Sequence, residues 1–236
     1  MRYQFVDCRW TLGEPGAGRE LYLAGHIPGA SYLDVDADLS ARPGAEGRHP
    51  LPSADAFAQA ASRAGIGDGV FVVAYGNMGG AERLWWLLRH FGHDDCAVID
   101  FESWRGQLGS GQEEIEPADF VPRERHDDTI TAEELAARAN DPRLLVLDAR
   151  LPERYRGAPN PVDRVPGHIP GARNAPYTGA LPKEALEAEE VAVYCGSGVT
   201  ATVQLLNLVR AGRSDAKLYP GSWSEWEHLD LPVEKG

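Results

Sequence analysis

The stretch Val191-Ala192-Val193-Tyr194-Cys195-Gly196-Ser197-Gly198-Val199-Thr200 joins a short apolar run to a glycine-containing loop. Apolar residues then recur with helical spacing as far as Val209, and Gly212 is a stop signal. The pattern predicts a strand that delivers a thiol into a tight loop at a helix N-terminus. Converging N–H groups and the helix dipole favour the thiolate there. Cys195 is therefore a candidate nucleophile, although a strand-to-helix turn can also bury an inert cysteine.

Composition limits the class of protein. The 236 residues suffice for one large domain or two small ones, and the net charge of −13 argues against binding to nucleic acid or to anionic membrane surfaces. The sequence contains no apolar signal core and no apolar run long enough to span a bilayer. The cysteines, at positions 8, 96 and 195, have neither paired nor metal-like spacing. We expect a cytoplasmic protein without a metal or organic cofactor.

The chain contains an internal repeat. Residues 25–30 and residues 167–172 both read Gly-His-Ile-Pro-Gly-Ala. Further matches occur in the same order before and after this motif: Val6-Asp7-Cys8-Arg9 with Leu147-Asp148-Ala149-Arg150, Tyr75-Gly76 with Tyr194-Cys195, and Ser103-Trp104 with Ser222-Trp223. This order predicts a domain duplication. We place the two domains at 1–124 and 125–236, with an insertion in the first between Gly29 and Tyr75.

Each half alternates short apolar runs with helical patterns. Strands are predicted at 70–74, 97–99, 144–147 and 191–194, and helices at 53–64 and 81–91. Thr131 and Glu134 form a predicted capping box ahead of another helix. The fold class is therefore α/β, with a mainly parallel central sheet flanked by helices in each half. Ligands of such sheets lie at the carboxyl ends of the strands, where Cys195 is expected.

These motifs resemble the tandem rhodanese-domain sulfurtransferases over almost the whole chain. The resemblance rests on the Asp-x-Arg and Gly-His-Ile-Pro-Gly-Ala of each half, on the loop cysteine of the second half, and on Tyr219-Pro220-Gly221-Ser222-Trp223. It implies two rhodanese-like domains in tandem, of which the first is catalytically silent because Gly76 stands where a cysteine would be needed. The uncharged loop is similar to that of the 3-mercaptopyruvate sulfurtransferases, whereas thiosulfate sulfurtransferases more often place basic residues there.

The resemblance also implies a set of catalytic residues. In mercaptopyruvate sulfurtransferases a serine two residues after the cysteine acts with a histidine and an aspartate of the first domain. Ser197, His49 and Asp36 match them, although Asp34 could take the place of Asp36. His49 and Asp36 lie in the insertion, which could otherwise be a plain surface loop. The arrangement combines a hydroxyl, an imidazole and a carboxylate, and its expected work is proton delivery.

Two arginines of the family hold the donor's carboxylate. Arg154 matches the first of them, and a guanidinium can bind a carboxylate through two hydrogen bonds. The segment is shortened by two residues relative to the family, so the second matched position is either Val162 or Arg164. We favour Arg164. The loop residues Gly196, Gly198, Val199 and Thr200 complete the expected substrate-binding set.

The expected reaction moves a sulfane sulfur from 3-mercaptopyruvate to a thiol or cyanide, through a persulfide on Cys195, and releases pyruvate. Thiosulfate is the alternative donor, and a thiol protein such as thioredoxin is an expected acceptor. A cysteine phosphatase would need an arginine six residues after the cysteine, where this chain has Ala201. A non-catalytic binding module would suit a chain without Cys195. His26 and His168 recur in both halves, so we expect them to serve the fold.

Overall fold

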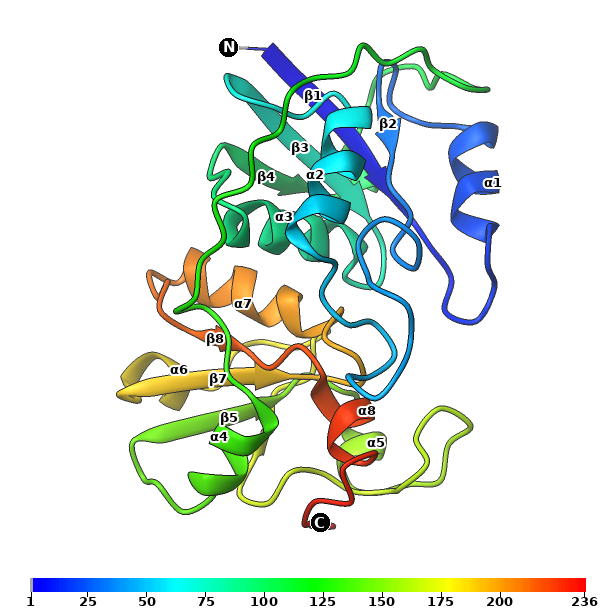
Figure 1. Cartoon of the computed structure of the whole chain (residues 1–236). Helices are drawn as coiled ribbons and strands as arrows, with labels where there is room; N and C mark the ends of the chain where they lie inside the picture. Colours follow the sequence, from blue (N-terminus) through cyan, green and yellow to red (C-terminus); the bar gives the residue numbers. More distant parts are fainter. Residues whose placement is uncertain (1) are drawn as a thin grey trace. The chain divides into compact units, whose positions relative to one another are not determined.

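The chain divides into two compact units in the computed structural model, which describes residues 2–236 (Figure 1). Unit 1 consists of Met1–Ala41 and Leu51–Arg125, and unit 2 consists of Arg42–Pro50 and His126–Gly236. The segment Arg42–Pro50, which contains His49, therefore packs with the second half, although it precedes most of unit 1 in the sequence. The division into two rhodanese-like domains at 1–124 and 125–236 stays a prediction.

Unit 1 is built on a parallel sheet with strand order β2-β1-β3-β4. Its helix α3 packs against β1, β3 and β4. The elements in chain order are β1 (Arg2–Cys8), α1 (Ala17–Ala24), β2 (Ser31–Tyr32), α2 (Ala54–Arg63), β3 (Val70–Gly76), α3 (Gly80–His90), β4 (Cys96–Ile99) and the 3₁₀ turn η1 (Phe101–Ser103).

Unit 2 repeats this plan with the order β6-β5-β7-β8, again all parallel. Helix α7 packs along β7 and β8, as Figure 1 shows. The elements are α4 (Ala132–Ala137), β5 (Leu144–Asp148), α5 (Pro152–Tyr155), β6 (Arg173–Asn174), α6 (Glu184–Glu187), β7 (Glu190–Tyr194), α7 (Ala201–Arg210), β8 (Lys217–Leu218) and α8 (Ser222–Trp226). The predicted fold class is confirmed.

Local sequence signals account for several element boundaries. The Ser53 hydroxyl accepts the Ala56 N–H at the start of α2, and the predicted capping box of Thr131 and Glu134 forms at the start of α4. Gly212 follows α7 with φ at +91°, a conformation that glycine adopts without steric cost. Polar caps and a terminal glycine thus fix these helix ends.

The repeated motifs form the same internal contacts in each unit. The Asp7 carboxylate accepts a forked pair from Arg9, and Asp148 does the same with Arg150. The hydroxyls of Tyr75 and Tyr194 accept a backbone N–H from the repeated Ile-Pro turn, each at 3.1 Å. These buried groups hold the strand ends in place.

The repeated histidines make matching contacts too. His26 stacks on Tyr22 with ring centroids 4.2 Å apart, and His168 stacks on Tyr155 at 3.8 Å. In both cases the histidine Nδ1 lies 2.8 Å from the carbonyl oxygen of that tyrosine. This recurrence agrees with a role in the fold.

Among the described residues, no helix has both the length and the apolar character that a bilayer crossing requires.

Candidate active site

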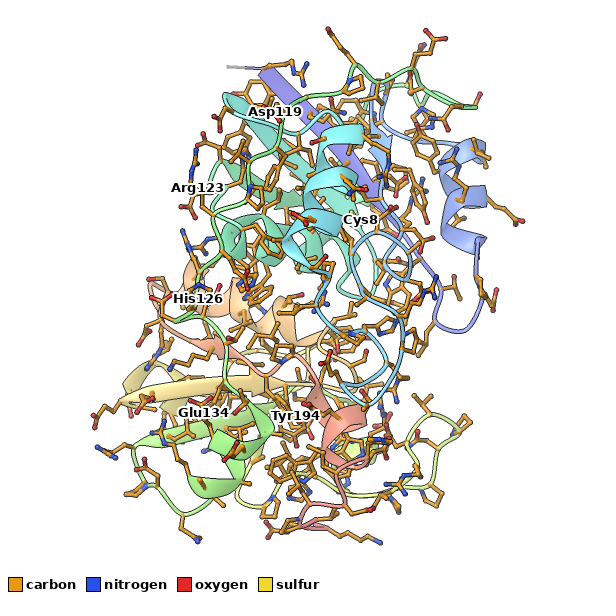
Figure 2. All side chains as sticks on the ribbon, in the orientation of Figure 1. Cys8, Asp119, Arg123, His126, Glu134 and Tyr194 are labelled. Atoms are coloured by element: carbon orange, nitrogen blue, oxygen red, sulfur yellow. The ribbon has the colours of Figure 1, made fainter. Side chains whose placement is uncertain are left out.

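Cys195 lies directly after β7, at the carboxyl end of the sheet of unit 2. Figure 2 labels Tyr194, the last residue of that central strand. The Cys195 side chain is almost completely buried, at 1% exposure, and the Gly198 N–H donates to its Sγ over 3.2 Å. The loop therefore turns back on the sulfur and offers it a backbone donor, as the sequence predicts. Gly198 can make this turn because it adopts a φ of +81°.

The loop backbone is held by the segment Tyr219–Ser224, which contains the start of α8. The Cys195 N–H donates to the Ser222 hydroxyl at 3.1 Å, and the Cys195 carbonyl accepts from the Trp223 N–H at 3.0 Å. The Gly196 carbonyl accepts from the Ser224 N–H, also at 3.0 Å. Ser222 has a φ of +53°, which costs a non-glycine residue free energy. Its hydroxyl also donates to the Tyr219 carbonyl, so both of its hydrogen-bonding functions are used.

His49 and Ser197 meet inside unit 2. The His49 Nδ1 lies 2.7 Å from the Ser197 Oγ, and both side chains are buried, at 5% and 8% exposure. The segment before His49 lies against α8, because a Cβ on Gly47 would come within 2.8 Å of the Gly221 carbonyl oxygen. The structure therefore brings together the serine and the histidine that the sequence singled out.

Two guanidinium groups flank Gly196. A Cβ built there would lie 2.9 Å from Arg48 Nη2 and 2.8 Å from Arg154 Nη2. Arg48 donates to the carbonyls of Val162 and Gly196, each at 3.1 Å, while its buried Nε has no hydrogen-bond partner in residues 2–236. Burial lowers the pKa of Arg48 from its ordinary value. Guanidinium groups remain protonated in proteins, so the loop carries two cations at its edge.

Arg154 is paired with a buried carboxylate. Its Nε and Nη2 donate to the two oxygens of Asp163 at 2.8 and 2.5 Å, and the Asp163 side chain is 1% exposed. Burial alone would raise the pKa of Asp163, but the hydrogen bond and charge of Arg154, with the charge of Arg150, lower it below its ordinary value. Asp163 is therefore ionised near neutral pH, and Arg154 is compensated.

Arg164 does not join this group of cations. Its guanidinium donates to the Glu227 carbonyl and pairs with Asp230 at 3.0 Å, and its side chain is 58% exposed. The second cation at Gly196 comes instead from Arg48, next to His49 in the sequence. The shortened segment contributes only its backbone, through the Val162 carbonyl. No feature of the local pattern separates Arg48 from a surface arginine, so its place could not be read from spacing.

The remaining expected residues occupy simpler positions. Val199 is buried, and its carbonyl accepts from the N–H and the hydroxyl of Thr202. Thr200 precedes α7 without capping it through its side chain. Asp36 belongs to unit 1, where it is exposed and its N–H donates to Asp34 Oδ1 at 2.9 Å. Its role toward His49 stays a prediction.

The matched position in unit 1 has no room for a side chain. A Cβ on Gly76 would lie 2.9 Å from the Cys8 carbonyl oxygen and 3.1 Å from the Ala81 nitrogen. The Cys8 thiol itself is buried, and burial raises its pKa well above the ordinary value. Unit 2, by contrast, brings together a sulfur, a hydroxyl with an imidazole, and two guanidinium groups, an arrangement that can act on an anionic substrate.

The chain matches known proteins along nearly its entire length. The family described as "Rhodanese-like domain" matches residues 1–107 and 131–229. The 3-mercaptopyruvate sulfurtransferase of Homo sapiens is 35% identical, over 94% of this chain and 84% of that protein. A Mycobacterium tuberculosis protein with the provisional name thiosulfate sulfurtransferase SseB is 39% identical, over 98% and 90%. The crystal structure of SseA from Escherichia coli, a 3-mercaptopyruvate sulfotransferase by its description, superposes with a TM-score of 0.80 at 30% identity, covering 94% of this chain and 93% of that one.

The contacts of Ser222 lead to a stability prediction. Ser222→Ala leaves the buried Cys195 N–H and Tyr219 carbonyl without their hydroxyl partner, so the free energy of unfolding should fall by about 1–3 kcal/mol. Urea denaturation followed by tryptophan fluorescence measures this loss. Ser214→Ala, at an exposed position, is the matched control and should change stability by less than about 0.5 kcal/mol. Equal stabilities of the two variants would contradict a role of the Ser222 hydroxyl in holding the loop at Cys195.

Proposed function

Because the chain belongs to the rhodanese family of sulfurtransferases, we propose that unit 2 transfers a sulfane sulfur from 3-mercaptopyruvate to a thiol or cyanide, through a persulfide on Cys195. The observation that carries this choice of donor is the buried 2.7 Å contact between His49 and Ser197. A donor with a keto group profits from such a hydroxyl, whereas thiosulfate has no carbonyl to polarise. In this proposal unit 1, which has Gly76 at the position matching Cys195, is catalytically silent.

The first step forms the persulfide. The Cys195 thiolate attacks the donor's sulfur, and an S–S bond forms while the S–C bond breaks. The electron pair of the broken bond leaves with the carbon, as the enolate of pyruvate. Ser197 donates a hydrogen bond to the developing enolate oxygen, and His49 relays the proton that completes pyruvate, with Asp36 as its orienting carboxylate. The proton count balances, because the proton that the sulfur loses equals the one that the carbon gains.

The second step returns the enzyme to its starting state. A thiolate acceptor attacks the outer sulfur of the persulfide, takes it, and releases the Cys195 thiolate. Loop N–H groups such as that of Gly198 stabilise the negative charge on sulfur in both steps. A dithiol protein such as thioredoxin is a suitable acceptor, and the free thiols Cys8, Cys96 and Cys195 fit a reducing cytoplasm. Two half-reactions on one sulfur give ping-pong kinetics.

The donor's carboxylate binds between Arg48 and Arg154 in this proposal. Both groups lie against Gly196, next to the nucleophile, whereas Arg164 is engaged with Glu227 and Asp230. Charge-assisted hydrogen bonds from two sides fix the direction of the carboxylate as well as its charge. The second candidate donor is thiosulfate, which would use the same persulfide while releasing sulfite.

The experiment that tests the function is intact-mass analysis after treatment with 3-mercaptopyruvate. The wild-type chain should gain one sulfur atom and lose it again on addition of cyanide, with one pyruvate formed for each sulfur. Cys195→Ser should gain none, while Cys96→Ser, the matched control at a half-buried thiol, should behave like the wild type. A wild-type chain that takes up no sulfur from this donor or from thiosulfate would refute the proposal.

The role of Ser197 predicts a difference between donors. Ser197→Ala should lower kcat/KM for mercaptopyruvate by about 10²–10³, the usual cost of removing a donor to a developing oxyanion. Thiosulfate has no such oxygen, so its kcat/KM should change by less than about threefold, which serves as the internal control. Parallel losses with both donors would mean that the hydroxyl supports the loop rather than the carbonyl chemistry.

The two candidates for the second cation can be compared directly. Arg48→Gln should lower kcat/KM for mercaptopyruvate at least about tenfold, because a charge-assisted hydrogen bond to the carboxylate is worth about 1.5–3 kcal/mol. Arg164→Gln removes an arginine of the same unit and should stay within about twofold of wild type. Steady-state kinetics with a fixed acceptor measure both. The opposite ranking would return the role to Arg164.

A further inference from the structure

The Asp163 carboxylate lies between two guanidinium groups. One belongs to Arg150, just after β5, and the other to Arg154, next to Gly196 of the loop. Asp163 accepts both hydrogen bonds of the Arg154 fork, and its Oδ2 is 3.5 Å from Arg150 Nη1. That Nη1 makes no hydrogen bond within residues 2–236, so its contact with Asp163 is electrostatic. Asn160 fixes the carboxylate further, since its amide donates to Asp163 Oδ2 at 3.0 Å and its own oxygen accepts the Asp163 N–H.

Charge pairing at the loop leaves one cation without a partner carboxylate. Arg150 is held by Asp148, with the closest pair of atoms 2.6 Å apart, and Arg154 is held by Asp163. Arg48 forms no ion pair with any carboxylate in the part of the chain that the structure describes. A partly buried cation without a counter-ion is costly and favours an anionic ligand. Asp163 and Glu227 act on Arg48 only at longer range, so its charge is less directly compensated than the charges of Arg150 and Arg154.

Unit 1 shows that the fold does not require this arrangement. Arg9 and Arg150 make the same fork to the aspartate two residues earlier, and their Nη2 atoms donate to Gly25 and Gly167. In residues 2–236, Arg9 has no further ion pair of the kind that Arg150 has with Asp163. The further carboxylate, that of Asp163, and the loop cysteine, Cys195, thus both belong to the second half.

We propose that Asp163 determines the charge of the donor that unit 2 accepts. By neutralising Arg154, it leaves the charge of Arg48 to match one carboxylate, as in 3-mercaptopyruvate. This single cation compensates the dianion of thiosulfate poorly beside the Cys195 thiolate. Asp163 thus acts against the competing donor rather than for the preferred one, a common route to specificity. It is a positioning residue, since it acts on the donor through Arg154. The inference rests on the proposed function of the same site.

Donor kinetics test this inference. In Asp163→Asn the carboxylate charge is lost, so the ratio of kcat/KM for thiosulfate to kcat/KM for mercaptopyruvate should rise at least about tenfold at constant ionic strength. Asp163→Glu keeps the charge and should keep the wild-type ratio even if both values fall. Asp215→Asn removes an exposed, arginine-paired carboxylate of the same unit and should leave the ratio unchanged. Equal losses with both donors in Asp163→Asn, and an unchanged ratio, would overturn the proposal.

Anion binding gives a second test that needs no turnover. Methanesulfonate and sulfate are similar in shape and differ in charge. Isothermal titration at constant ionic strength should show tighter binding of methanesulfonate, and the order should reverse in Asp163→Asn. Tighter binding of sulfate to the wild type would overturn the inference. Failure of the proposed function is recognised separately, by the absence of sulfur uptake from either donor.

Discussion

The course of residues 195–200 depends on backbone hydrogen bonds from the segment Tyr219–Ser224. A loop with glycines at 196 and 198 has many accessible conformations, so ordering it costs conformational entropy. The bonds to Cys195 and Gly196 offset that cost, and they fix both the direction of the sulfur and the place of the Ser197 hydroxyl. Ser222 sustains an unfavourable backbone conformation in doing so, a cost that concentrates at functional sites.

A comparison of the two units distinguishes the residues that the fold requires from those that serve the proposed reaction. Both have the aspartate–arginine fork, the tyrosine hydroxyl at the strand end and the stacked histidine, so these groups belong to the scaffold. Within the described part of the chain, the loop thiol and a second acidic partner for the repeated arginine occur in unit 2 alone. The strand end of unit 1 is closed at Gly76, where the backbone of Cys8 leaves no space for a side chain. A cysteine at position 76 would require movement of β1 as well as the substitution.

Much of the architecture could be predicted from the sequence because short-range signals determine it. Apolar runs give the strands, Ser53 and Thr131 cap the helices where expected, and the repeat shows that one plan occurs twice. Cys195 could be found because a strand, a glycine loop and a helix follow one another directly. The pairing of His49 with Ser197 could be expected only from family resemblance, since their separation in the sequence carries no geometric information.

The positions of Arg48 and Asp163 were harder to predict from the sequence, for a physical reason. A guanidinium lies several rotatable bonds from its Cα, so the position of an arginine in the sequence says little about where its charge lies. Arg164 is nearer to the matched position, yet it turns to Asp230, while Arg48 reaches Gly196 from a distant segment. The place of Asp163 depends on the turn at Asn160, whose side-chain oxygen accepts the N–H groups of Val162 and Asp163.

The grouping of Arg42–Pro50 with the second half has a consequence for the self-sufficiency of that half. Here nine residues of the first half pack with the second, and they include His49 and Arg48. A gene encoding residues 126–236 alone would lack both. The covalent link to the first half supplies this segment to the second at a high effective concentration.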